Sequence, residues 1–187
     1  MRALGPGLAI AFAFAIALAR PHAPAVAAQT YPLAVARSKA TFAVTHLYVS
    51  RVTGSIPIVA GTVAFADGDV PSAVEATLDA RRIATDDRDR DDDLQGPDWF
   101  DTKAFPLWTF RSDAIAPAPG GFTMHGTLAV HGVPQAVVLN VTIVRGLPHA
   151  AYHATGTLDR HGFGMHRTPM DGLIGGTIDL ALDVELP

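Results

Sequence analysis

Apolar and polar residues alternate along most of the chain after residue 30, which is typical of strands that turn one face toward a core. The last segment shows this most clearly, because small or acidic side chains separate the apolar residues Ile178, Leu180, Leu182, Val184 and Leu186. The same period of two occurs in 39–46, 72–79 and 136–145. No segment of this region sustains a helical period.

Turn-forming sequences separate the alternating segments, among them ADGDVPS, APAPGG, HGVPQ and RGLPH. We therefore expect strands at 31–36, 39–46, 58–66, 72–79, 106–113, 121–130, 136–145, 150–159 and 173–186, with the first two forming one bent strand. Even spacing and short turns predict an all-β fold, an extended eight-stranded antiparallel barrel, with a two-sheet sandwich as the alternative. A closed barrel leaves no exposed edge, and eight strands enclose room for one elongated ligand.

One segment interrupts the strands, and it predicts a short helix and loop at residues 85–101. Thr85 is suited to cap the helix, with Asp86 and Asp87 in its first turn. Asp86 with Arg90, and Arg88 with Asp92, are spaced to pair along its surface. We expect this segment to lie across one end of the barrel.

The first 28 residues have the pattern of a secretory signal peptide. A basic start is followed by the apolar run LAIAFAFAIALA and then by small residues up to Ala28. The apolar run is too short to cross a hydrocarbon core, which requires roughly twenty residues. We therefore expect cleavage, export to the periplasm or the exterior, and a mature domain over residues 29–187.

Composition narrows the functional classes. The chain has 14 Lys and Arg against 18 Asp and Glu, and two of the arginines lie in the leader. A nucleic-acid-binding protein needs clustered Lys and Arg residues, and this acidic chain does not show such clusters. The chain has no cysteine, which excludes disulfides, thiol catalysis, c-type haem and a lipid-modified cysteine.

Four motifs occur in a specific order: THLYVSRVTGSI, TDDRDRDDDLQGPDWFDTKAFPLWTFRSD, GTLAVHGVPQAVVLNV and DRHGFGM. With the leader, they resemble the YceI-like family of secreted, lipocalin-like proteins, and the resemblance extends from Tyr31 to the end. Two positions depart from the family pattern. Asp93 stands where the family has His, and Trp99 replaces the first residue of a Phe pair.

The resemblance implies an eight-stranded lipocalin-like barrel with a long apolar tunnel. Its ligand would be a long-chain isoprenoid lipid: a polyprenol, a polyprenyl phosphate or an isoprenoid quinone. The implied role is non-enzymatic, in transport, storage or stress response, with no catalytic residue, metal or cofactor. Besides the lipid, a homodimer and a transient contact with a membrane or membrane protein are the partners that we expect, and no nucleic acid.

The ligand-binding residues predicted on this basis fall into three groups. The tunnel wall is assigned to Phe42, Val44, Leu78, Phe110, Leu128, Leu139, Val141, Phe163 and Ile178. Trp99 and Phe100 are assigned to closing or lining one end of the tunnel, and Trp108 is assigned as a further aromatic wall. Contact with a polar head group is assigned to His46 and Arg160, since Arg pairs with phosphate oxygens and His donates to a quinone carbonyl.

Each group has a structural alternative. The alternation alone favours an ordinary solid barrel core, and the family resemblance reverses that preference. Trp99 and Phe100 fit a small cluster that holds the loop in place. Arg160 fits a buried salt bridge with an acid such as Asp91, and His46 fits a tight loop.

A periplasmic metal-binding protein or a hydrolase that uses His and Asp residues is the alternative function. HGFGMH places His161 and His166 five residues apart, but no H-E-x-x-H motif occurs. The acidic run lacks the spacing of a calcium loop, and no G-x-S-x-G motif is present.

Overall fold

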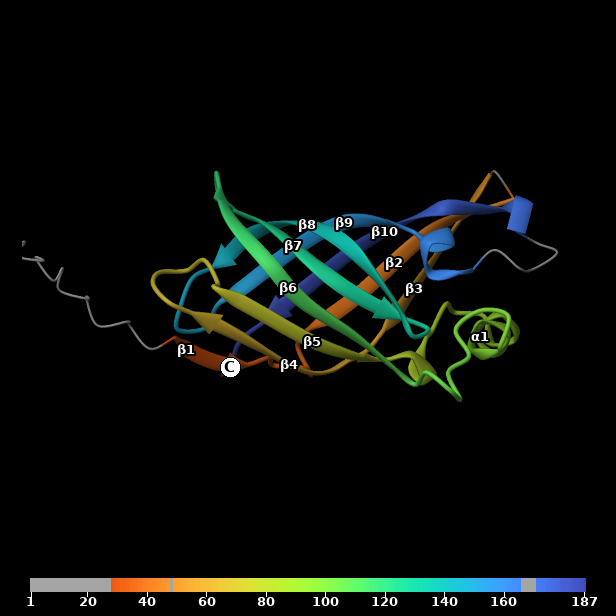
Figure 1. Cartoon of the computed structure of the whole chain (residues 1–187), viewed down its shortest axis with the longest axis horizontal. Coiled ribbons are helices and arrows are strands. Elements are labelled where there is room, and N and C mark those ends of the chain that lie inside the picture. Colours follow the sequence, from red (N-terminus) through yellow and green to blue (C-terminus); the bar gives the residue numbers. More distant parts are fainter. Residues whose placement is uncertain (1–27, 48, 166–170) are drawn as a thin grey trace, which may run out of the picture.

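The described residues form one antiparallel sheet that curls into an elongated barrel (Figure 1). The computed structural model describes residues 28–47, 49–165 and 171–187. Along the sheet the strands follow the order β1-β4-β5-β6-β7-β8-β9-β10-β2-β3. Their bounds are β1 Gln29–Pro32, β2 Lys39–His46, β3 Ser50–Ile56, β4 Ile58–Phe65, β5 Ala73–Asp79, β6 Leu107–Ala118, β7 Gly121–Val130, β8 Val133–Arg145, β9 Ala151–Asp159 and β10 Ile174–Glu185.

Ten strands are present where eight were predicted, and Pro57 accounts for one of the two extra strands, while the short β1, which pairs with β4, is the other. Pro57 alone separates β3 from β4, where its missing N–H interrupts the ladder. Because β3 pairs with β2 while β4 pairs with β5, the segment 50–65 connects the two sides of the sheet and counts as one barrel strand. Near this junction, Leu33 N donates to Gly61 O at 3.0 Å and Ala34 N donates to Glu185 O at 2.8 Å.

Two strand predictions were wrong in detail. The predicted strand 31–36 is β1, Gln29–Pro32, and the chain turns after it to meet both β4 and β10. The strand β3 was missed because its sequence SRVTGSI is mostly polar or small and shows no apolar alternation. Pairing with β2 holds this segment in a strand, with Ala40 opposite Ile56 at one end of the ladder and His46 opposite Ser50 at the other.

The predicted helix is α1, Arg88–Gln95, but its cap is Asp87 rather than Thr85. The Asp87 carboxylate accepts from Arg90 N at 3.1 Å and lies 3.6 Å from the Arg90 guanidinium, which therefore pairs with Asp87 and not with Asp86. Thr85 is instead a buried anchor: its N–H and hydroxyl both donate to Asp91 Oδ1, at 2.8 and 2.6 Å. Arg90 donates to the Thr85 hydroxyl and carbonyl, so the acidic helix is tied to the barrel by these polar contacts.

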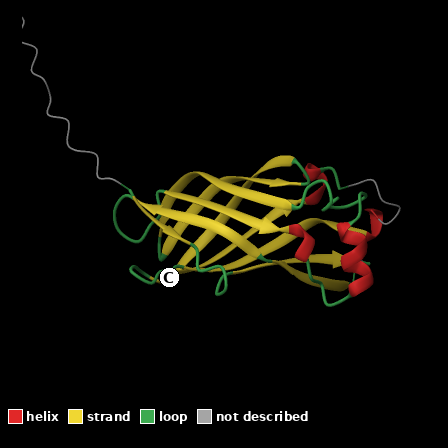
Figure 2. Ribbon diagram, turned by 90° about the horizontal axis from the view of Figure 1, so that it is seen from below, coloured by secondary structure: helices red, strands yellow, loops and turns green. Residues whose placement is uncertain are grey.

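The helical segments gather at one end of the barrel and the C-terminus lies at the other (Figure 2). The 3-10 helices are Ala80–Arg82, Arg160–Phe163 and Asp171–Leu173. Among the described residues, no helix is both long enough and apolar enough to span a membrane. The leader predicted over 1–28 lies outside the described residues except for Ala28.

Candidate functional site

A cavity of about 560 Å³ runs inside the barrel, and we call it the tunnel. Its length follows from β10, where the lining residues extend from Ile174 to Val184. Ten residue steps along a strand cover about 34 Å, and the usual barrel tilt reduces this to about 25 Å along the axis. The interior is therefore long and narrow, which suits a linear ligand rather than a compact one.

The tunnel wall is almost entirely apolar because the inward positions of nearly every strand carry aliphatic or aromatic side chains. Most predicted wall residues lie on it: Phe42, Val44, Leu78, Phe110, Leu128, Leu139, Phe163 and Ile178. The alternation also indicated Ala40, Ala76 and Leu180, which line the tunnel as well. Further lining residues, which were not assigned from the sequence, include Leu33, Ile56, Ile58, Met124, Leu158 and Met165.

Two glycines leave room inside the barrel. A Cβ atom at Gly54 would come within 2.4 Å of the Phe42 ring, and one at Gly126 within 2.5 Å of the Phe110 ring. Both rings therefore lie against neighbouring strand backbone, a packing in which an aromatic residue covers a strand glycine. This arrangement keeps two large side chains on the wall while the lumen stays open.

The tunnel is filled at the end far from α1. Buried apolar residues close it there, namely Phe65, Phe122, Val141, Tyr152 and Leu186. Val141 was assigned to the tunnel wall, but it is absent from the lining and belongs to this plug, opposite Phe122 in the β7–β8 ladder. The Tyr152 hydroxyl donates to Asp69 O at 3.0 Å, and burial raises the pKa of Tyr152 to about 12, so the phenol stays neutral.

The mouth of the tunnel lies beneath α1. Exposed acids of the helix and its cap reach the lining here, namely Asp87, Asp89 and Asp93. Arg90 also contributes, but its guanidinium is engaged by Thr85 and Asp87. The solvent-facing rim is therefore negatively charged, while the interior behind it is apolar.

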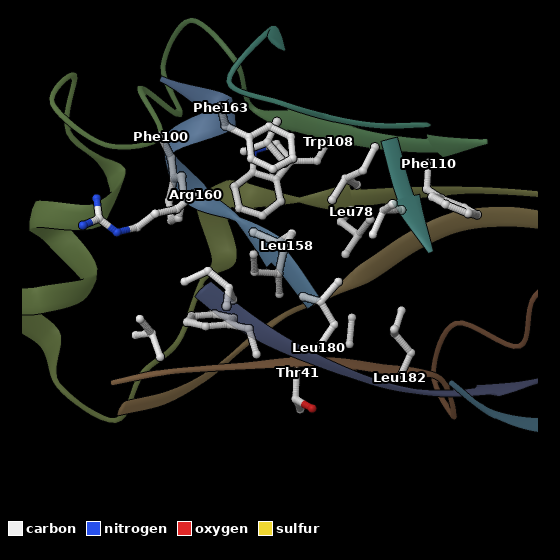
Figure 3. Close-up of a pocket in the computed structure, with 18 of the residues that line it drawn as sticks. Thr41, Leu78, Phe100, Trp108, Phe110, Leu158, Arg160, Phe163, Leu180 and Leu182 are labelled. Atoms are coloured by element: carbon white, nitrogen blue, oxygen red, sulfur yellow. The ribbon is translucent and has the colours of Figure 1, made fainter. Parts of the chain in front are cut away.

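Aromatic side chains form the inner wall just below the mouth (Figure 3). Phe100 packs edge-on against Trp108, with ring centroids 4.7 Å apart and planes at 74°. Phe163 is 1% exposed and belongs to the same apolar cluster. Trp99 is only partly buried and also lines the tunnel. Trp99 and Phe100 thus line the tunnel and also hold the loop after α1 in place.

Trp108 carries an unusual polar atom. The residue is 8% exposed, and its indole Nε1 has no hydrogen-bond partner among the residues that the structure describes. Within 28–47, 49–165 and 171–187 it is the one buried side-chain nitrogen or oxygen without a partner. The sequence did not signal this, since it does not reveal which acceptors surround a buried tryptophan.

Arg160 is buried at the same end, with 2% of its surface exposed. Its Nε donates to Gly175 O at 2.9 Å, and its Nη2 donates to the carbonyl oxygens of Asp171 and Ile174 at 3.0 and 2.9 Å. Its Nη1 donates to Met165 O and forms a 2.7 Å salt bridge with Asp171 Oδ1. All five N–H groups of a guanidinium are used in this way.

These contacts favour the structural alternative for Arg160, with Asp171 as the acid in place of Asp91. Hydrogen bonding from Arg160 holds the pKa of Asp171 below its ordinary value of 3.8. The guanidinium carbon also lies 6.0 Å from the centre of the Trp99 ring. Arg160 therefore joins the start of β10 to the aromatic wall, and a head-group contact through its nitrogens would require breaking these bonds.

His46 lines the tunnel at the end of β2, where it lies opposite both Ser50 and Ile174. Its backbone carbonyl accepts the Ser50 hydroxyl at 2.8 Å, as expected for a tight loop. No hydrogen bond of its imidazole occurs among the described residues. The loop alternative and a ligand contact are thus compatible for this residue, and its contact with a head group stays a prediction.

Metal-ligating side chains do not assemble in the described part of the chain, where no group of three His, Asp or Glu is placed to hold an ion. The His161 imidazole lies 3.1 Å from Asp159 and 3.2 Å from Asp171. It faces these carboxylates outside the tunnel lining, and His166 lies outside the described residues.

Comparison with known proteins gives one consistent result. The family model for the YceI-like domain matches residues 31–186. Protein YceI of Escherichia coli O17:K52:H18 is 26% identical over 152 residues, covering 77% of this chain and 78% of the relative.

Solved structures share the fold. BcnA of Burkholderia cenocepacia superposes with a TM-score of 0.70 at 19% identity, over 82% of this chain and 98% of that one. A polyisoprenoid-binding domain from Saccharophagus degradans, implicated in plant cell wall breakdown, has a TM-score of 0.64 at 16% identity, over 83% and 97% of the two chains.

Proposed function

The chain belongs to the YceI-like domain family, and from this membership and the tunnel we propose that it binds one long-chain isoprenoid lipid without covalent chemistry. The observation that carries the proposal is the shape of the interior: a cavity of about 560 Å³, apolar along its length and blind at one end. Its volume lies within the range of small-molecule sites, roughly 300–1,000 Å³. An isoprenoid chain would bury its methyl and methylene groups there at about 0.8 kcal/mol for each methylene.

A structural neighbour supports the choice of ligand. The Saccharophagus degradans domain is described as polyisoprenoid-binding, and it has the same barrel. The tunnel of this chain is long, narrow and apolar, which suits a linear isoprenoid chain. A branched, flexible chain would extend from the mouth under α1 toward the plug formed by Phe122 and Tyr152.

We propose a binding protein rather than an enzyme, active in transport, storage or stress response. The two guanidinium groups near the mouth are engaged by partners from the chain: Arg160 by Asp171, and Arg90 by Thr85 and Asp87. Binding by burial of apolar surface requires neither a catalytic residue nor a cofactor.

The leader supports a location in the periplasm or outside the cell, where a carrier would exchange lipid with membranes. Three apolar side chains are exposed in the turn between β2 and β3 and in the 3-10 helix before β10: Leu47 at 46%, Val49 at 91% and Leu173 at 37%. These segments lie at the same end of the barrel as α1 (Figure 1). We propose that they contact a membrane transiently during exchange. We also propose that two copies of the protein can associate as a homodimer.

An uptake experiment tests the proposed function. Delipidated mature protein is incubated with vesicles that contain an isoprenoid quinone or a polyprenol, then separated from them by flotation. Stoichiometric lipid in the protein fraction is the expected result. If the folded protein takes up neither lipid, the proposal is refuted, and the metal-binding and hydrolase functions become the alternatives to test.

A further inference from the structure

The closed end of the tunnel limits how much of an isoprenoid chain the barrel can bury. The last lining residues toward this end lie one on each of β7, β8, β9 and β10: Met124, Leu139, Ala154 and Val184. Two residues further toward this end, the next inward positions are four plug residues: Phe122, Val141, Tyr152 and Leu186. The plug therefore begins directly beneath the floor of the tunnel, along four neighbouring strands.

The plug is held in place by the loops behind it. Phe122 is 3% exposed and packs edge-on against Tyr152, with ring centroids 5.8 Å apart and planes at 68°. The Tyr152 hydroxyl donates to Asp69 O, and the Asp69 carboxylate accepts the Leu147 N–H at 2.8 Å. These bonds join the aromatic pair to the β4–β5 and β8–β9 loops. A ligand chain cannot displace Tyr152 without breaking them, or move Phe122 without losing its close packing against Tyr152.

An isoprenoid would enter this tunnel with its hydrocarbon tail first. The charged residues of the lining lie at the mouth, on or beside α1 and at the start of the 3-10 helix 160–163: Asp87, Asp89, Arg90, Asp93 and Arg160. The four floor residues are apolar, and the hydroxyl of Tyr152 is already bonded to Asp69. A polar head group at the floor would be buried without a partner, which destabilises the complex. The head group therefore stays at the mouth, and the tail ends against the plug.

The length of the tunnel corresponds to a number of isoprene units. From Ile174 to Val184 on β10, the lining covers about 25 Å along the barrel axis. An isoprene unit adds four carbon atoms to the main chain of the lipid, and at bond lengths of about 1.5 Å one extended unit covers about 5 Å. The tunnel thus buries about five units, and each further unit stays outside the mouth, where its apolar surface remains in water.

We propose that Phe122 and Tyr152 determine the length of the isoprenoid chain that the protein selects: the tunnel buries about five units, and longer chains favour a membrane over the protein. This inference rests on the proposed function and adds the chain length to it. A membrane buries every added unit, whereas the tunnel buries added units only until the tail reaches the plug. Phe122 and Tyr152 are thus specificity-determining residues that act by closing the tunnel.

The test measures how isoprenoids of different length distribute between the protein and a membrane. Delipidated mature protein is incubated with phosphatidylcholine vesicles that contain isoprenoid quinones with one common head group, in steps of one isoprene unit from shorter to longer than the tunnel. A second mixture contains prenols over the same lengths. After flotation, mass spectrometry gives the ratio of each lipid in the protein to that lipid in the vesicles.

Two substitutions move the floor in opposite directions, and each has a matched control. Phe122→Ala removes a ring directly beneath the floor, whereas Phe105→Ala removes a ring that packs against His131 outside the tunnel lining. Ala154→Leu adds bulk at the floor, whereas Thr155→Leu adds bulk at the next position of β9, which is exposed and outside the tunnel lining. Circular dichroism checks that each variant is folded.

In the wild-type protein the ratio should stay nearly level up to about five units and then fall at least tenfold for each further unit, because that unit leaves the membrane interior for water. The fall should begin at the same length for quinones and prenols, since the tail and not the head group meets the plug. Two residues along a tilted strand cover about 5 Å of the axis, so Phe122→Ala should raise this length by about one unit and Ala154→Leu should lower it by about one unit. Phe105→Ala and Thr155→Leu should leave it unchanged.

A ratio that does not fall for chains longer than the tunnel would overturn the proposal, because the plug would then not limit the chain. A fall that begins at the wild-type length in both folded Phe122→Ala and folded Ala154→Leu would overturn it as well. In both results the wild-type protein still binds isoprenoids, so the proposed function stands. Failure of the wild-type protein to take up any member of either series would instead refute the proposed function.

Discussion

The ring of Phe42 lies so close to Gly54 that a Cβ atom built on the glycine would come within 2.4 Å of Phe42 Cζ. The two residues are directly paired across β2 and β3, on the side of the sheet that faces the tunnel. Thr85, the anchor of α1, lies on the same spot, with its Cγ2 2.9 Å from that Cβ position. Because Gly54 has no side chain, the wall residue Phe42 and the anchor Thr85 of α1 can both pack against it.

We therefore expect Gly54→Ala to force the Phe42 ring toward the lumen. Overpacking of this kind costs about 1–3 kcal/mol of stability, and the displaced ring should reduce ligand uptake more than it reduces folding. Thermal melting and lipid uptake measure the two effects separately. Phe42→Leu in the same chain should relieve the clash, and a double variant no better than Gly54→Ala would argue against this coupling.

A charge inside the tunnel should prevent ligand binding. Leu139 lines the tunnel and is 5% exposed, whereas its neighbour Val138 points outward and is 43% exposed. Leu139→Lys should lower ligand retention at least tenfold, because the buried ammonium would have no partner, and Val138→Lys should retain the ligand. Lipid extraction after purification gives the readout, with circular dichroism as the check on folding. Full retention by a folded Leu139→Lys protein would contradict the assignment of the inner face.

Trp99 should slow the escape of the ligand, since it lines the tunnel beside the mouth and lies near Arg160. Trp99→Ala removes this aromatic surface, and release to acceptor vesicles should become about tenfold faster. The measurement is the rate at which labelled lipid moves to an excess of vesicles. A release rate equal to that of the wild type would limit Trp99 to holding the loop in place.

The Arg160–Asp171 pair should make stability depend on pH in the acidic range. Because the pKa of Asp171 is lowered in the folded state, its stabilising effect is present above the unfolded value near 3.8 and is lost as the pH falls through the folded value. Asp171→Asn should therefore melt at a lower temperature than wild type at neutral pH. The difference in melting temperature between the two proteins should narrow as the pH falls below about 3.8. A difference that stays constant over this range would show that the charge of the Asp171 carboxylate does not contribute to stability.

The barrel was predictable because its strands carry their apolar residues on one face, as in β10, where Ile178, Leu180 and Leu182 all reach the tunnel. The strand β3 was not predictable from local pattern, since pairing with β2 and closure through Pro57 order a polar and glycine-containing segment. Likewise, the helix at 88–95 was predicted while its cap was not. Thr85 instead forms side-chain hydrogen bonds with Asp91 and Arg90, and a capping rule based on local sequence does not include such bonds.

The site was predictable at its wall and less so at its polar ends. Residues on alternating faces reach the lumen, whereas Val141 belongs to the plug because the barrel is filled at that end. The partner of Arg160 is Asp171, eleven residues further along the chain, and nothing in the spacing distinguishes it from Asp91. The unpaired indole of Trp108 depends on the absence of an acceptor among its neighbours, which only the folded arrangement reveals.

The central claim is that the tunnel holds an isoprenoid lipid, and native mass spectrometry of the mature protein purified from its own envelope tests it most directly. The account predicts a protein that carries one lipid molecule, which extraction identifies as an isoprenoid. A protein that carries no lipid, and remains empty after incubation with added isoprenoids, would contradict it.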